Sequence, residues 1–148
     1  MTTRRVLVAD PIAERGVKLL QEAEGIQVDV RPDIGAIADK AEQEKVLVEL
    51  IPAYEGLIVR SGAKATAAVI EAGSGTLRAI GRAGVGVDNI DIPTATKHGV
   101  VVMNTPAGNT ISTAEHAFTL MMALARHIPQ GHQSVVEGRF KEGRKAYK

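Results

Sequence analysis

The stretch Val6-Leu7-Val8-Ala9, followed at once by Asp10 and Pro11, decides the class of fold. A continuous apolar run of this kind is typical of a strand that is covered on both faces of a parallel sheet. Asp10 suits the cap of a following helix, and Pro11 suits its first turn. The sequence therefore begins with a strand that leads directly into a helix.

The same pattern recurs along the chain. Further short segments rich in apolar residues predict strands at residues 28–30, 56–60, 77–81 and 100–104. Apolar residues at helical spacing predict helices between them, at residues 12–23, 38–50, 65–72 and 92–97. Strands that alternate with helices form βαβ units and a parallel sheet. We therefore predict an α/β fold over residues 1–105, a flavodoxin-like, doubly wound parallel sheet that binds ligands at the carboxyl ends of its strands.

The pattern changes after Pro106, so residues 106–148 form a second predicted region. Ser112 and Glu115 fit a capping box. Apolar residues then recur at helical spacing, and they predict a helix over residues 112–128 that Pro129 ends. Its apolar face is wide, which indicates that another surface covers it. That surface is the sheet, a further domain or a second subunit, and we expect self-association.

Composition and charge narrow the class of function. Eighteen Lys and Arg oppose 17 Asp and Glu, a net charge of +1 that does not suggest a nucleic-acid partner. Residues 139–148 hold five Lys or Arg and one Glu, which we interpret as a basic tail that forms a solvated loop rather than a nucleic-acid arm. The chain has no Cys, and its first apolar run is too short for a signal peptide or a membrane span. We expect a cytoplasmic protein with no membrane partner.

Two predicted strand ends carry residues suited to binding an anion. Arg60-Ser61-Gly62 follows a buried strand, where the guanidinium and the backbone N–H groups can hold an anionic group. A surface salt bridge explains Arg60 equally well. The run from Gly81 to Asn89 is rich in glycine, but it fails the G-x-G-x-x-G test because Asn89 takes the third glycine position. That run is either a nest of N–H groups for an anion or a glycine-rich turn.

The histidines do not point to a metal site. His98, His116, His127 and His132 show no recognised zinc spacing with each other or with carboxylates. We therefore predict no metal.

Four segments, in this order and at this spacing, resemble the N-terminal part of the D-isomer-specific 2-hydroxyacid dehydrogenases. They are residues 57–62, 80–91, 102–110 and 112–116. Within the family, the pair Arg60 and Arg82 makes the chain similar to the branch that oxidises 3-phosphoglycerate in L-serine biosynthesis. The resemblance implies hydride transfer between NAD and a phosphorylated 2-hydroxy acid in a homo-oligomeric enzyme. It also implies that residues 106–148 contain the crossover helix of a truncated Rossmann NAD domain.

The resemblance also implies roles for individual residues. Those on the substrate side are Arg60, Ser61, Gly62, Arg82, Gly84, Val85, Gly86 and Asn109. Those near the nicotinamide are Val85, Thr113 and Ala114. The family's catalytic Arg, Glu and His and its G-x-G-x-x-G loop have no counterpart, so we expect no catalytic residue in this chain and no activity of the chain alone. The alternatives are a stand-alone anion-binding or regulatory module and another branch of the family, such as a glyoxylate or D-lactate enzyme.

Overall fold

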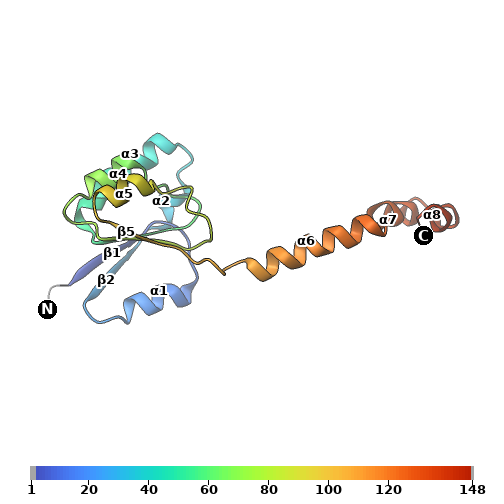
Figure 1. Cartoon of the computed structure of the whole chain (residues 1–148), viewed down its shortest axis with the longest axis horizontal. Coiled ribbons are helices and arrows are strands. Elements are labelled where there is room, and N and C mark those ends of the chain that lie inside the picture. Colours follow the sequence, from blue (N-terminus) through green and yellow to red (C-terminus); the bar gives the residue numbers. More distant parts are fainter. Residues whose placement is uncertain (1–2, 148) are drawn as a thin grey trace. The chain divides into compact units, whose positions relative to one another are not determined.

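The computed structural model describes residues 3–147 and contains a five-stranded, all-parallel sheet (Figure 1). Its strands are β1 (Arg4–Val8), β2 (Ile26–Val30), β3 (Gly56–Val59), β4 (Ala79–Arg82) and β5 (Val101–Met103). They lie in the order β2-β1-β3-β4-β5. The chain thus adds one strand beside β1 and then crosses it to add three on the other side. This is the predicted doubly wound α/β arrangement, and all five predicted strands are confirmed.

Helices cover both faces of the sheet. Those of this part of the chain are α1 (Glu14–Gln21), α2 (Pro32–Ala36), α3 (Lys40–Leu50), α4 (Ala67–Ala72) and α5 (Ile92–Lys97), with a short 3₁₀ helix η1 (Ile51–Ala53). Figure 1 shows α3, α4 and α5 on one face and α1 on the other. Helix α2 was not among the predicted helices, since Pro32 after a strand is also typical of a strand's end. Proline also fits the first turn of a helix, and Pro32 occupies that position here.

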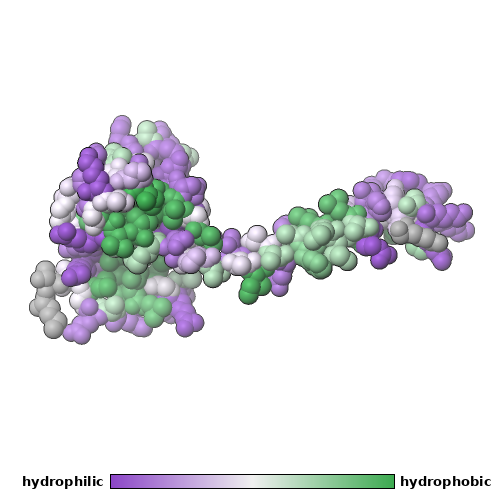
Figure 2. All heavy atoms as spheres, viewed as in Figure 1, coloured by the Kyte–Doolittle hydropathy of each residue, from purple (hydrophilic) through white to green (hydrophobic). Residues whose placement is uncertain are grey.

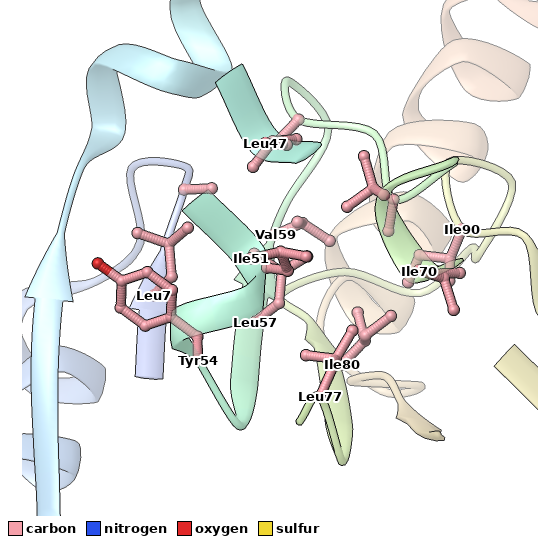
Figure 3. Close-up of a cluster of buried hydrophobic side chains, with 14 of the residues drawn as sticks. Leu7, Leu47, Ile51, Tyr54, Leu57, Val59, Ile70, Leu77, Ile80 and Ile90 are labelled. Carbon is pink, nitrogen blue, oxygen red and sulfur yellow. The ribbon is translucent and has the colours of Figure 1, made fainter. Parts of the chain in front are cut away.

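The hydrophobic core lies between the sheet and the face that carries α3, α4 and α5 (Figure 3). Leu57 of β3 and Ile80 of β4 are fully or almost fully buried, as are Leu47 of α3 and Ile70 of α4. Burying one such side chain contributes roughly 1.5–3 kcal/mol. This core therefore fixes β3 and β4 side by side, and their carboxyl ends carry the two loops of interest.

The opposite face of the sheet is less covered. Side chains alternate between the faces along a strand, so Val101 and Met103 of β5 point away from the core, and both are exposed. Helix α1 buries none of its residues. Figure 2 shows hydrophobic side chains at the surface of this part of the molecule.

A second compact unit begins at Asn109, after a first unit that ends at Gly108. It contains α6 (Thr110–Ala125), α7 (Ile128–Val136) and α8 (Phe140–Ala146). Helix α6 exposes its large apolar side chains, among them Phe118 and Leu124. Figure 2 shows a hydrophobic surface along α6. Among residues 3–147, no helix has the length and hydrophobicity needed to cross a bilayer.

Three expectations for this second unit are wrong. Ser112 does not cap the helix, because α6 already begins at Thr110 and the Ser112 hydroxyl donates to the carbonyl of Asn109 at 3.1 Å. Pro129 does not end the long helix but lies in the first turn of α7. The basic tail is not a loop, since most of it forms α8. Gly143 of α8 packs against Ser134 of α7, where a Cβ atom would not fit.

Candidate functional site

The site lies at the carboxyl edge of the sheet, where two loops leave neighbouring strands. Val59, the last residue of β3, pairs in register with Arg82, the last residue of β4. Arg60, Ser61 and Gly62 follow the first strand, and the Gly84–Gly86 loop follows the second. The topology thus brings together seven of the predicted site residues, from Arg60 to Gly86.

The loop after β3 is held by two side chains that are distant in sequence. Asp10, only 2% exposed, accepts the N–H groups of Arg60 at 2.6 Å and Ala63 at 2.9 Å. Asn89 donates from Nδ2 to the carbonyl groups of the same two residues, at 3.0 Å and 2.8 Å. Asp10 therefore holds this loop in place. The prediction from the sequence that Asp10 caps a helix is wrong. Helix α1 begins after Ala13 without a side-chain cap.

Arg82 ties the two loops together. Its Nε donates to the carbonyl of Arg60 at 3.0 Å, and its Nη1 donates to the carbonyl of Gly86. Its Nη2 lies 3.8 Å from a carboxylate oxygen of Asp88. Most of the guanidinium's hydrogen bonds thus go to backbone carbonyls, which orients both loops. The Arg60 side chain is exposed instead, and no hydrogen bond or ion pair engages it within residues 3–147.

The loop after β4 presents backbone donors. Asn104 donates from Nδ2 to the carbonyl of Val85 at 2.6 Å, and the N–H of Thr105 donates to the carbonyl of Gly84 at 3.0 Å. The N–H groups of Val85 and Gly86 donate to no other group in the described part of the chain. These N–H groups and the exposed guanidinium of Arg60 on the neighbouring loop are groups suited to bind a carboxylate or phosphate.

The remaining predicted residues belong to the second unit. Asn109 immediately precedes α6, and its side chain makes no capping hydrogen bond. Thr113 and Ala114 lie near the start of α6, and both are exposed. Their roles toward substrate and nicotinamide stay predictions.

Titratable groups with clearly shifted pKa values lie away from these loops. In the first unit, the Arg5 guanidinium donates to Asp29 at 2.7 Å, and Tyr54 donates to the same oxygen at 2.9 Å. The hydrogen bond from Arg5, with that from Tyr54, holds the pKa of Asp29 below its usual range. Burial raises the pKa of Tyr54. This cluster joins β1 and β2 and is structural.

A metal site is not evident. Within residues 3–147, no group of three or more His, Asp or Glu side chains is placed to hold a metal ion. His98 is the one histidine of the first unit, and its Nδ1 lies within hydrogen-bond distance of the Ser74 hydroxyl, at 3.2 Å.

Known proteins resemble the chain over most of its length. The sequence profile described as "D-isomer specific 2-hydroxyacid dehydrogenase, catalytic domain" matches residues 6–142.

The chain belongs to this family.

Within the family, it is similar to enzymes named D-3-phosphoglycerate dehydrogenase. It is 46% identical to that of Synechocystis sp. over 139 residues and 48% identical to that of Archaeoglobus fulgidus over 136 residues. These matches cover 94% and 92% of this chain but only 23% and 24% of the relatives. The chain thus spans about a quarter of the length of these relatives. The predicted resemblance to the family and to its phosphoglycerate branch is confirmed.

A solved structure agrees with this assignment. The NAD⁺-bound 3-phosphoglycerate dehydrogenase of Entamoeba histolytica matches with a TM-score of 0.65 and 33% identity. The match covers 84% of this chain and 40% of that one. The described residues therefore share their fold with part of an NAD⁺-bound member of the family.

Proposed function

We propose that the chain supplies substrate-binding loops of an NAD-dependent D-3-phosphoglycerate dehydrogenase, which converts 3-phosphoglycerate to 3-phosphohydroxypyruvate in L-serine biosynthesis. The observation that carries the proposal is the pair of adjacent loops at the carboxyl edge of β3 and β4. They combine the exposed Arg60 guanidinium with N–H groups of Ser61, Gly62, Val85 and Gly86 that have no acceptor within residues 3–147. The similarity to D-3-phosphoglycerate dehydrogenases supports this assignment.

Both the charge of the arginine side chains and the fixed geometry of the loops contribute to binding. Arg60 pairs with the carboxylate or the phosphate of the substrate, and the N–H groups donate to the same anion. Arg82 holds the loops in register through its carbonyl contacts and adds positive charge beneath them. Asn109, at the start of α6, is proposed to bind the substrate near its reacting carbon.

The described residues do not fit a complete NAD site. The Gly84–Gly86 loop does not lead into a helix, since α5 begins only at Ile92, and Asn89 replaces the third glycine of the fingerprint. We therefore derive no hydride-transfer step from these residues. Val85, Thr113 and Ala114 remain proposed contacts of the nicotinamide, and the catalytic acid/base and its partners are assigned to none of the residues of this chain.

Assembly and location follow as further parts of the proposal. Phe118, Met121 and Leu124 expose a wide apolar surface on α6, which supports a homo-oligomer. The absence of cysteine fits a cytoplasmic enzyme.

Titration of the chain with 3-phosphoglycerate, followed through backbone amide NMR signals, tests the proposal. We expect the amides of Ser61, Gly62, Val85 and Gly86 to shift. Arg60→Ala is expected to weaken binding by about tenfold or more, because a charged hydrogen bond is lost. Arg78→Ala is the matched control, since Arg78 lies just before β4, at the opposite edge of the sheet.

Ligand choice separates the branches of the family. A phosphoglycerate site binds 3-phosphoglycerate more tightly than D-glycerate or D-lactate, which lack the phosphate. Equal shifts with D-lactate would favour another branch, and the absence of any shift at these four amides would contradict the proposal. We expect no turnover of NAD and 3-phosphoglycerate by this chain alone. Turnover would contradict the proposal that this chain lacks the catalytic residues.

A further inference from the structure

The loop after β3 is fixed at both of its ends, and each end uses both of its backbone groups. Arg60 and Ala63 each donate an N–H to Asp10 and each accept a hydrogen bond from Asn89 at the carbonyl. Both N–H groups reach the same carboxylate oxygen, Oδ2 of Asp10. A single buried acceptor and a single buried donor thus bridge the two ends of a four-residue loop.

The carbonyl of Gly62 is occupied as well. Gln43, which is buried in α3, donates to it from Nε2 at 3.1 Å, and Lys40 donates to it from Nζ at 2.9 Å. Three backbone groups of residues 60–63 are left without a hydrogen bond to the part of the chain that the structure describes. They are the N–H and carbonyl groups of Ser61 and the N–H of Gly62.

Close packing beneath the loop adds to this restraint. A Cβ atom at Gly62 would lie 2.5 Å from the carbonyl oxygen of Gly35 and would also meet the Asp10 carboxylate. A Cβ atom at Gly35 would lie 2.9 Å from the carbonyl oxygen of Ala9. The backbone of the loop therefore rests directly on the carboxylate and on α2, and it has little room to rotate.

We propose that Asp10 and Asn89 are positioning residues for substrate: they turn the N–H groups of Arg60 and Ala63 inward and thereby leave those of Ser61 and Gly62 available to an anion. The inference rests on the proposed function, because it assumes that this loop binds the carboxylate or phosphate. Donors held in place before binding cost less free energy to order when the ligand arrives.

The role assigned to Asp10 is geometric and not electrostatic. A buried carboxylate close to an anion site repels the anion, so its charge alone would weaken binding. Asparagine can place one oxygen where Oδ2 now lies and can accept both N–H groups without the charge. Asp10→Asn is therefore expected to bind 3-phosphoglycerate within about threefold of the unsubstituted chain or more tightly, whereas Asp10→Ala is expected to bind about tenfold or more weakly.

The test uses the full chain and amide NMR with 3-phosphoglycerate as the probe. Asp33→Ala is the matched control, because Asp33 is an exposed carboxylate that pairs with Arg31. The inference predicts that Asp10→Ala loses the shifts of the Ser61 and Gly62 amides, that Asp10→Asn restores them and that Asp33→Ala leaves them unchanged. Rescue by asparagine distinguishes positioning from a general loss of stability.

Hydrogen exchange in the unsubstituted chain provides a second arm that needs no variant to fold. The amides of Arg60 and Ala63 are expected to exchange as slowly as amides of β3, and those of Ser61 and Gly62 rapidly. Equal exchange at all four positions would overturn the inference, as would unchanged binding in Asp10→Ala. If the unsubstituted chain shows no shift with 3-phosphoglycerate, the proposed function fails first and the assigned role of Asp10 falls with it.

Discussion

The two units of the chain differ in where their apolar side chains lie. In the first unit, Leu57 is 1% exposed and lies in a core that the sheet and three helices enclose (Figure 3). In the second unit, α6 buries none of its residues, and Leu124 is 74% exposed. A parallel sheet is stabilised by the core that it shares with its helices, whereas a single apolar helix gains most of its stability from a covering surface. The contrast indicates that the first unit has a core of its own, whereas the apolar side chains of α6 are uncovered within the described residues.

Matched leucine substitutions give the largest test of this contrast. Leu57→Ala is expected to lower the free energy of unfolding of the first unit by about 2–5 kcal/mol, because it leaves a cavity in the core. Leu124→Ala is expected to change it by less than about 0.5 kcal/mol, since the side chain is already in water. Urea unfolding, followed through the amide signals of β3 and of α6, measures both effects.

The Leu124 variant also tests assembly. If α6 is covered by a second copy, Leu124→Ala shifts the protein toward monomers, and light scattering detects the change. A loss of several kcal/mol from the first unit in Leu124→Ala would break the contrast, because it would show that the core of that unit depends on α6.

Two glycines sharpen the contrast at an intermediate magnitude. Gly62→Ala forces a Cβ atom against the carbonyl oxygen of Gly35 at 2.5 Å and is expected to cost about 1–3 kcal/mol. Gly131 lies within α7, where a Cβ atom would have no neighbour within 4 Å. Gly131→Ala is therefore expected to stabilise that helix by about 0.5–1 kcal/mol, because alanine favours helical backbone.

Thermal unfolding measured by circular dichroism compares the two glycine variants, and amide NMR reports the loop. A Gly62→Ala protein with unchanged stability and unchanged Ser61 signals would show that the loop adapts. The close packing beneath it would then be incidental.

Much of the fold was predictable because its signals are local. Most strands contain a short apolar run that is followed by a polar residue, and the pattern at Val6–Asp10 recurs at β3 and β5. The position of Arg60-Ser61-Gly62 in the site was predictable for the same reason, since ligands of such sheets bind where strands end. Glycine content alone made the run from Gly81 to Asn89 a candidate, and the family resemblance added a role for Arg82.

The residues that hold the site in place were not predictable from local patterns. Asp10 acts on residues 50 and 53 positions away, and the sequence around it fits a helix cap equally well. Gln43 is one of several polar residues of the predicted helix at residues 38–50, and Asn89 stood out only as the wrong residue for a nucleotide loop. Long-range hydrogen bonds leave no periodic trace in one sequence, so only the folded chain reveals these contacts.

In the second unit, local patterns were misleading at two places. Helix α8 was missed because charge at Arg139, Lys141 and Arg144 suggested a solvated loop. Lys, Arg and Glu also favour helices, and Gly143 lets α8 pack closely against Ser134 of α7. The Ser112 and Glu115 spacing predicted a cap that the earlier start of α6 makes impossible.

A further small effect concerns acid sensitivity. Asp29 is paired with Arg5, which is 24 positions away in sequence, so the pair exists only while β1 and β2 are associated. The hydrogen bond from Arg5, with that from Tyr54, holds the pKa of Asp29 below its usual range in the folded state. A lowered folded pKa contributes stability above the unfolded value, and this contribution is lost as the pH falls through the folded value. Asp29→Asn is expected to remove up to about 1 kcal/mol at neutral pH and to flatten this part of the acid dependence.

Glu137 provides the matched comparison in the second unit. Its pKa is also lowered, first by a hydrogen bond from Gln133 and then by Arg139, but both partners are local in sequence. Glu137→Gln should therefore leave the unfolding of the first unit unchanged at every pH, and Asp29→Asn should not. The free energy of unfolding of the first unit, measured from about pH 6 to about pH 2, separates the two. If both variants changed the unfolding of the first unit equally, the Arg5–Asp29 pair would contribute no more than a surface contact. Acid sensitivity would then be spread over the whole chain.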